Sequence, residues 1–264
     1  MKKFIMAVAM ILAVVLSCGV FAGCSKPTVT IGYTDYAPMN YEEDGELVGF
    51  DTELAKTVFA NLGYEVRFKL IEWPNKYMEL DSGTIDCVWN GFTANVADDD
   101  GIQRSDKVDF SYNYMTNAQC VIRKSSTAEL SSSAQFVGKS VTYESGSAGE
   151  TYVKGVAGNV NKQPADSQMV AIQKVSAGTA EYAVVDVLLA RAIAGQGNYA
   201  DIVINESIVI DAEFYAIGFK KGSELTSKVN AELVKLAENG YLATLAEKYG
   251  LSTQVITDYA DQIA

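Results

Sequence analysis

The feature that most constrains the fold is a regular alternation of short apolar strands and amphipathic helices in the first half of the chain. The predicted strands cover residues 29–33, 64–70 and 85–89, and the helices between them cover 51–62 and 75–81. This alternation is typical of a sheet whose parallel strands are joined by right-handed helical crossovers. Asp51 is expected to cap the first helix and Gly63 to end it. The sequence therefore predicts a doubly wound α/β sheet.

A second unit of the same kind follows a long extended run at residues 115–123. After a serine-rich loop at 125–133, strands are predicted at 139–144, 182–185, 208–210 and 215–219. One helix is predicted to begin at residues 146–149, and four more are predicted at 169–177, 186–194, 224–238 and 241–249. Each unit would hold roughly one hundred residues, which is a usual domain size. We therefore expect two α/β lobes.

The first residues indicate export. Lys2 and Lys3 precede an apolar stretch that ends in small residues before Cys24, which is the pattern of a signal peptide. The residues before Cys24 resemble a bacterial lipobox, so we expect residues 1–23 to be removed and Cys24 to be diacylated. Residues 24–27 would then be a lipidated tether on the outer face of the bacterial cell membrane. Cys18 is an alternative lipid site, and secretion with a free Cys24 is a second alternative.

The charge of the chain excludes several classes of partner. Removal of residues 1–23 takes away two lysines and no acids, which leaves 19 basic and 33 acidic residues. A surface this acidic repels nucleic acid and has no polybasic patch for a membrane, so attachment requires the lipid. We expect a monomer with no nucleic-acid partner.

Several enzyme and metal chemistries are also excluded. The chain has no histidine, which rules out Ser-His and Cys-His catalytic pairs and histidine metal ligands. Cys87 and Cys120 read as two buried thiols, with a single disulfide left open as the alternative. The acidic run 98–100 lacks calcium-ligand spacing and is interpreted as a solvated loop. We predict no metal, no cofactor and no catalytic residue.

Polar residues follow the predicted strands where ligand sites of open α/β sheets occur. Asn90, Gly91 and Thr93 follow the strand at 85–89, with Arg104 a few residues on, and Asp186 follows the strand at 182–185. An amide, a hydroxyl and a guanidinium together suit a small carboxylate. The alternatives are a polar loop that caps a strand, a solvated helical position for Arg104 and a helix N-cap for Asp186.

Several motifs together resemble the extracellular solute-binding proteins of family 3, the polar amino-acid receptors of ABC importers. They are Gly49-Phe50-Asp51-Thr52-Glu53-Leu54-Ala55, Gly83-Thr84-Ile85-Asp86, Val108-Asp109-Phe110-Ser111 with Tyr114, the run from Gly178 to Asp186, and Ile217-Gly218-Phe219-Lys220-Lys221-Gly222. The resemblance covers essentially all of residues 28–250. It implies a periplasmic binding protein-like fold of type II, with two lobes joined by two crossing hinge strands. Residues 28–115 and 216–264 would form lobe 1, and residues 116–215 lobe 2.

The resemblance also implies the site. Tyr36 and Trp73 would sandwich the ligand, Arg104 would take its α-carboxylate and Asp186 its α-ammonium. The remaining implied contacts are Tyr33, Asn90, Gly91, Thr93, Ser147, Ala148 and Gly149. The segment before Arg104 is longer than is usual in the family, which puts this residue's role in question. Ala148 stands where a hydroxyl residue is common.

The implied function is capture of an α-amino acid by hinge closure and its delivery to an ABC permease. The alternatives are a dehydratase-type enzyme on the same fold and a ligand-sensing receptor; no membrane helix is predicted up to Ala264, which favours the transport receptor. Tyr33 stands where receptors for basic amino acids carry an acid, so a neutral polar or sulfur-containing ligand is expected over arginine or lysine. Glu144 is the one candidate for a replacement acid.

Overall fold

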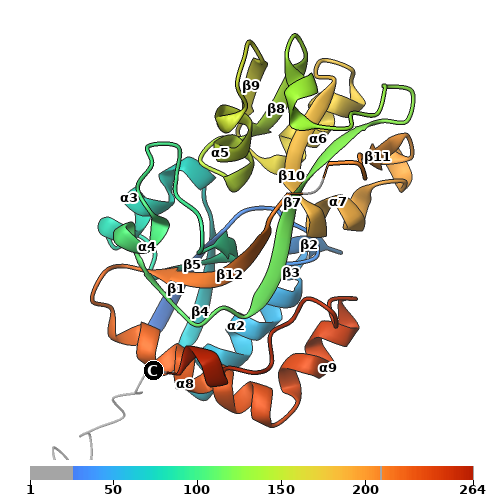
Figure 1. Cartoon of the computed structure of the whole chain (residues 1–264). Coiled ribbons are helices and arrows are strands. Elements are labelled where there is room, and N and C mark those ends of the chain that lie inside the picture. The colour runs from blue at the N-terminus through green and yellow to red at the C-terminus, as the bar shows by residue number, and fades with distance from the viewer. Residues whose placement is uncertain (1–25, 209, 264) are drawn as a thin grey trace, which may run out of the picture.

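The computed structural model describes residues 26–208 and 210–263. Its chain forms two lobes that are connected by two long strands, β7 (Met115–Lys124) and β12 (Ala212–Phe219) (Figure 1). The predicted signal peptide and the lipidation sites Cys24 and Cys18 lie outside the described residues. Two α/β lobes joined by two crossing strands are the fold class that the sequence predicted; the exact lobe boundaries stay a prediction.

The lower lobe in Figure 1, here lobe 1, contains both ends of the described chain. Its elements are β1 (Thr28–Tyr33), β2 (Tyr41–Glu43), β3 (Glu46–Val48), α2 (Phe50–Asn61), β4 (Glu65–Leu70), η1 (Trp73–Asn75), α3 (Lys76–Asp81), β5 (Cys87–Thr93), α4 (Arg104–Lys107), β6 (Asp109–Phe110), α8 (Glu224–Glu238), α9 (Tyr241–Lys248) and η4 (Ala260–Gln262).

The upper lobe, here lobe 2, is formed by the middle of the chain. Its elements are η2 (Ser133–Phe136), β8 (Ser140–Glu144), α5 (Ala148–Gly155), β9 (Asn161–Ala165), α6 (Gln168–Ser176), β10 (Tyr182–Asp186), α7 (Val187–Ile193), η3 (Gly197–Tyr199) and β11 (Ile202–Ile204).

The sheet is parallel within each lobe and antiparallel where the chain passes between them. The strand order is β4-β1-β5-β12-β7-β10-β8-β9. In lobe 1, β4, β1 and β5 are mutually parallel, and in lobe 2 so are β10, β8 and β9. β12 pairs antiparallel with both β5 and β7, and β7 pairs antiparallel with β10. The two connecting strands therefore hydrogen-bond to each other, and β12 also pairs with β5 and β6 of lobe 1 while β7 pairs with β10 and β11 of lobe 2.

The predicted strands and helices occur in the structure, with several differences in the strands; β12, for example, begins at Ala212, three residues before its expected start. β5 begins two residues later than expected and continues through Thr93, because its pairing with β12 extends from Cys87 to Thr93; all seven of its residues are buried. β9 was not predicted, since its sequence is polar and contains Pro164, which only an edge strand tolerates. Ile208 and Ile210, which were predicted to lie in a strand, belong to none and pack on the apolar core of lobe 2. The strand in this part of the chain is β11, which ends at Ile204.

Helix α2 corrects the expected role of Asp51. The helix begins after Gly49, whose φ of 119° favours glycine, and Gly63 ends it with a φ of 85°. Asp51 is inside the helix and completely buried, and its carboxylate accepts hydrogen bonds from the Gly91 N–H (3.0 Å) and the Tyr114 hydroxyl (2.8 Å). Its side chain therefore ties α2 to β5 and to the residue that precedes β7, and does not cap the helix.

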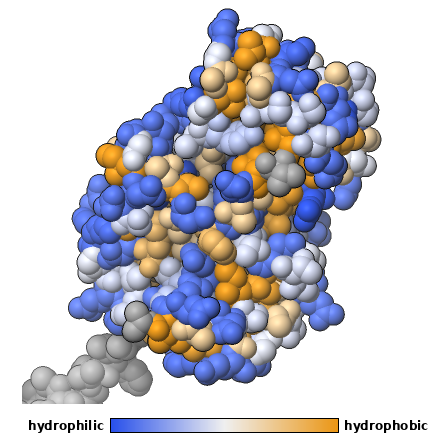
Figure 2. Space-filling model, viewed as in Figure 1, coloured by the Kyte–Doolittle hydropathy of each residue, from blue (hydrophilic) through white to orange (hydrophobic). Residues whose placement is uncertain are grey.

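Hydrophilic residues are interspersed with smaller hydrophobic groups over the face shown in Figure 2. The large hydrophobic side chains that are exposed, namely Leu70, Met78, Ile102, Val137 and Ile263, come from separate segments. Within the described part of the chain, no helix combines the length and apolar character that a membrane crossing requires. Cys87 and Cys120 are separate buried thiols, as expected.

Candidate ligand site between the lobes

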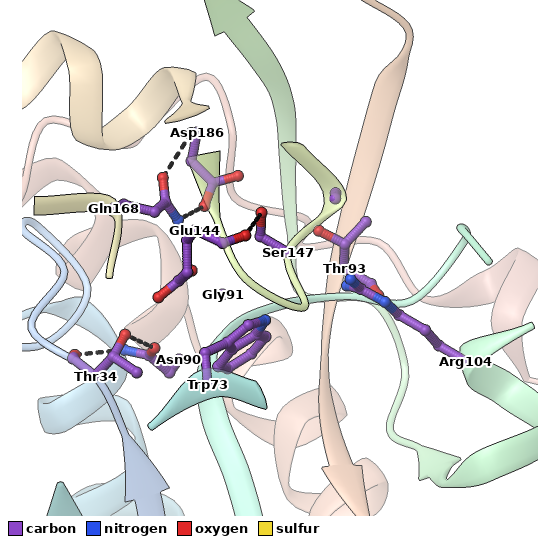
Figure 3. Close-up of a pocket in the computed structure, with 11 residues that line it drawn as sticks. Thr34, Trp73, Asn90, Gly91, Thr93, Arg104, Glu144, Ser147, Gln168 and Asp186 are labelled. Atoms are coloured by element: carbon purple, nitrogen blue, oxygen red, sulfur yellow. Dashed lines mark hydrogen bonds between the residues drawn. The ribbon is translucent and has the colours of Figure 1, made fainter. Parts of the chain in front are cut away.

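A narrow polar pocket lies between the two lobes. Side chains from both lobes line it: Thr34, Trp73, Asn90, Gly91, Thr93 and Arg104 from lobe 1, and Glu144, Ser147, Ala148, Gln168 and Asp186 from lobe 2 (Figure 3). The cavity left among these side chains has a volume of only about 10 Å³. The pocket is therefore almost filled by its own side chains, and a ligand fits only when these side chains or the lobes move apart.

Arg104 is the positive group of the pocket. It opens the short helix α4, and its side chain is only 1% exposed. Its Nε donates to Asp98 Oδ1 (2.8 Å), Nη1 to the Thr93 carbonyl (3.2 Å) and Nη2 to the Gly146 carbonyl (3.1 Å). These bonds hold the guanidinium rigidly at the end of β5. The longer segment before Arg104 therefore does not carry it away from the pocket.

Asp98 is part of this arrangement, which corrects the interpretation of residues 98–100 as a solvated loop. Its side chain is 8% exposed and also accepts from Lys107 Nζ (2.8 Å) and the Tyr77 hydroxyl (2.6 Å). Burial raises the pKa of the Asp98 carboxyl, but Arg104, Lys107 and Tyr77 outweigh it and lower the pKa to about 2. Asp98 is thus an anionic brace for Arg104.

Asp186 is the corresponding negative group of lobe 2. It is 5% exposed at the carboxyl end of β10, and its carboxylate accepts from Asn117 Nδ2 (2.8 Å), Gln119 Nε2 (2.5 Å) and Gln168 Nε2. Although Asp186 is the N-cap residue of α7, its side chain makes no capping hydrogen bond. The carboxylate faces the pocket, where burial raises its pKa.

A second buried carboxylate, Glu213 of β12, shares two donors with Asp186. Its Oε2 accepts from Asn117 Nδ2 and Gln119 Nε2 (both 3.1 Å) and from the Thr93 hydroxyl (3.2 Å). Burial and the charge of Asp186 raise the pKa of Glu213 to about 7. The connecting strands therefore place a second ionisable carboxyl group, which was not predicted from the sequence, next to Asp186.

The predicted strand-end group is used mainly within the protein. Asn90 Nδ2 donates to the Thr34 carbonyl (2.9 Å) and to Asn40 Oδ1 (2.8 Å), so both of its N–H groups are occupied. The Gly91 N–H donates to Asp51, and the Thr93 hydroxyl to Glu213. These residues line the pocket, but their donors primarily fix the end of β5.

The start of α5 supplies backbone N–H groups on the side of lobe 2. Ser147 caps the helix by accepting from the Glu150 N–H (3.2 Å), and its own hydroxyl donates to the Glu144 carbonyl (2.7 Å). The first N–H groups of a helix have no partner within it and attract anions. Ala148 lines the pocket, whereas Gly149 lies behind it; a Cβ there would come within 2.9 Å of the Val184 carbonyl oxygen.

One carbonyl of lobe 2 accepts three hydrogen bonds from lobe 1. Trp73 Nε1, Lys76 Nζ and Arg104 Nη2 all lie 3.1 Å from the Gly146 oxygen. Lys76 is 1% exposed, and burial followed by the charge of Arg104 lowers its pKa to about 7. The lobes thus touch at the pocket, and these contacts must break if the lobes separate.

Of the predicted aromatic pair, Trp73 lines the pocket and Tyr36 does not. The Tyr36 hydroxyl makes a 2.6 Å hydrogen bond with that of Tyr215, and the Tyr36 ring packs close to the Cα of Gly91. Tyr33 lines a different surface pocket. The structure therefore offers one aromatic face to a ligand at this pocket.

Thr34 and Gln168 line the pocket but were not among the predicted contacts, and Glu144 was named only as a candidate replacement acid. Thr34 directly follows the predicted strand at residues 29–33, so the rule that identified Asp186 would also have found it. Gln168 is the first residue of α6, and only the packing of α6 beside β10 brings it to Asp186. No group of three or more Cys, Asp or Glu side chains placed to hold a metal ion occurs among residues 26–208 and 210–263.

Comparison with known proteins agrees with this geometry. A sequence model of the family described as bacterial extracellular solute-binding proteins, family 3, matches residues 29–252. The chain belongs to this family. Its relatives are amino-acid-binding proteins of ABC transporters.

This family 3 protein resembles relatives with different ligands. It is 28% identical to the arginine-binding extracellular protein ArtP of Bacillus subtilis over 81% of this chain and 82% of the relative. It is 27% identical to the L-cystine-binding protein TcyJ of Escherichia coli, over 81% and 79% of the two chains. Among solved structures it resembles an ancestral arginine-binding protein bound to arginine, with a TM-score of 0.78, 30% identity and coverage of 85% and 98%. That ancestral protein has also been solved with glutamine.

Proposed function

We propose that this protein captures an α-amino acid between its lobes and delivers it to an ABC permease. The observation that carries the proposal is the placement of one fixed cation, Arg104 of lobe 1, and one fixed anion, Asp186 of lobe 2, around a single pocket. A zwitterion needs one group of each sign. The N-terminus of α5 adds N–H groups on the side of the carboxylate.

Closure of the hinge would follow from the same arrangement. The carboxylate and the ammonium of one ligand bind groups on opposite lobes, so the ligand makes both contacts only in the closed state. It therefore binds the closed state more tightly than the open state and shifts the equilibrium toward closure. The hydrogen bonds from lobe 1 to the Gly146 carbonyl belong to the closed state and stabilise it further. In the open state the pocket would be accessible to solvent.

A thermal-shift panel on refolded, ligand-free protein tests capture. We expect at least one of the twenty L-amino acids, or cystine, to raise Tm by several degrees. The matching amine without the α-carboxylate and the matching acid without the α-ammonium should have little effect. If none of the amino acids stabilises the protein, the proposed function is wrong.

We propose that the protein acts at the outer face of the cell membrane, attached through a lipid on Cys24. The support is the sequence pattern before Cys24 and the excess of acidic residues, which disfavours electrostatic attachment to a membrane surface. Cys24→Ala should release the protein into the medium, and Cys18→Ala should not. The opposite result would identify Cys18 as the lipidated residue. Uptake of the ligand should be lost in cells without the protein.

A further inference from the structure

One carboxylate in the pocket has no partner for one of its oxygens. Glu144 ends β8, is 3% exposed and lines the pocket. Its Oε1 is buried and accepts no hydrogen bond from any residue that the structure describes. By contrast, the carboxylate of Asp186 accepts from three amides. A buried polar atom without a partner is costly, so an oxygen left this way inside a pocket indicates a missing ligand group.

The charges that line the pocket do not balance for a neutral zwitterion. They are two acids, Glu144 and Asp186, and one base, Arg104. The ammonium and carboxylate of an amino acid would use Asp186 and Arg104, and Glu144 would remain. The nearby charge of Lys76 opposes the rise in the pKa of Glu144, but no salt bridge joins the two residues. The Lys76 ammonium donates instead to the Gly146 and Trp73 carbonyls and lies over the Trp73 and Tyr77 rings.

The position of Glu144 matches the direction of a ligand side chain. In Figure 3 its carboxylate points toward Asn90 and Thr34, on the side of the pocket away from Arg104. A ligand whose α-carboxylate lies at Arg104 would extend past the indole of Trp73 toward Glu144. Asn90 cannot supply the missing positive end, because both of its amide N–H groups are already donated.

We propose that Glu144 selects an amino acid whose side chain carries a positive charge, either a guanidinium or an ammonium. This inference rests on the proposed function, since it needs Arg104 and Asp186 to fix the ends of the zwitterion. It reverses the expectation of a neutral ligand, which was based on the absence of an acid at Tyr33. Burial and the nearby Asp186 raise the pKa of Glu144 to about 8, and a cation placed against it would restore the ionised form.

Pairs of ligands that differ only in charge test the proposal. Isothermal titration calorimetry on refolded wild-type protein would compare L-arginine with L-citrulline and L-lysine with L-norleucine. In at least one pair, the charged member should bind at least about thirtyfold more tightly, because a neutral partner leaves the buried carboxylate unpaired. In Glu144→Gln that ratio should fall to within about threefold.

Glu206→Gln provides the matched control, since it makes the same chemical change at an exposed position of the same lobe. It should keep the wild-type preference. If wild-type protein binds both citrulline and norleucine as tightly as their charged partners, or if Glu144→Gln keeps the ratio, the proposal is overturned while the proposed function stands. If no amino acid binds, both are wrong. The wild-type comparison decides the question even if the Glu144 variant fails to fold.

Discussion

Replacing Arg104 by methionine tests whether its guanidinium holds the α-carboxylate of the ligand. Of the five N–H groups of a guanidinium, three donate to Asp98, Thr93 and Gly146 in the structure. Two N–H groups remain for an incoming carboxylate. Each hydrogen bond to a charged group contributes about 1.5–3 kcal/mol. The substitution should therefore weaken binding by about 3–6 kcal/mol, a factor of roughly 10²–10⁴.

The measurement is a calorimetric comparison of two ligands on two proteins. The first ligand is the L-amino acid that binds most tightly, and the second is the same molecule without its α-carboxylate. Arg104→Met should lose the stated affinity for the first and should bind the second within about threefold of wild type. Lys107→Met is the control, because Lys107 also pairs with Asp98 but does not line the pocket. An equal loss for both ligands would refute a direct contact between Arg104 and the carboxylate.

Three further predictions concern pH, stability and backbone conformation. If Glu144 binds a cationic side chain, the affinity for that ligand should rise between pH 6 and 8 by up to about tenfold per pH unit as Glu144 ionises. Glu213 and Lys76, both with a pKa of about 7, also make the local charge more negative over this range. Glu144→Gln should flatten the dependence of affinity on pH. Burial raises the pKa of Asp51 from 3.8 to about 7. The contribution of this group to the free energy of unfolding is therefore fully present below pH 4 and falls by about 4 kcal/mol by pH 7. Urea titrations of Asp51→Asn at the two pH values should not show this decrease in the free energy of unfolding. Gly91→Ala should lower the free energy of unfolding by about 2–4 kcal/mol, because Gly91 has a φ of 60° and a Cβ would lie 2.7 Å from a tyrosine ring carbon; an unchanged urea midpoint would contradict this.

The strands and helices were largely predictable because their signals are local. A buried strand such as β5 is apolar along its length, and an amphipathic helix such as α8 repeats its apolar positions at helical spacing. Polar residues mark where the chain leaves these elements, so Asp186 could be placed at the end of β10 from the sequence. The same rule placed Asn90 at a strand end, whereas it lies in the middle of β5. The errors fell on β9 and on Ile208–Ile210, where pairing with a neighbour, and not local composition, decides whether a strand forms.

The directions of the polar side chains depend on partners that are distant in the sequence. Asp51 reads as a helix cap by its position, but it meets Gly91 and Tyr114, 40 and 63 residues further along the chain. Tyr36 turns its hydroxyl to Tyr215, 179 residues away, and so leaves the pocket. No pattern within a short window contains this information.

The sequence by itself determined the α/β alternation, the polar strand ends and the two oppositely charged candidates, because each depends on neighbouring residues. Tertiary structure alone decided that Asp98 braces Arg104, that three lobe 1 donors meet on the Gly146 carbonyl, and that Glu144 points into the pocket with one oxygen unpartnered. The physical reason is that desolvation and pairing of a charge depend on everything packed around it. The two lobes supply those surroundings only when they come together.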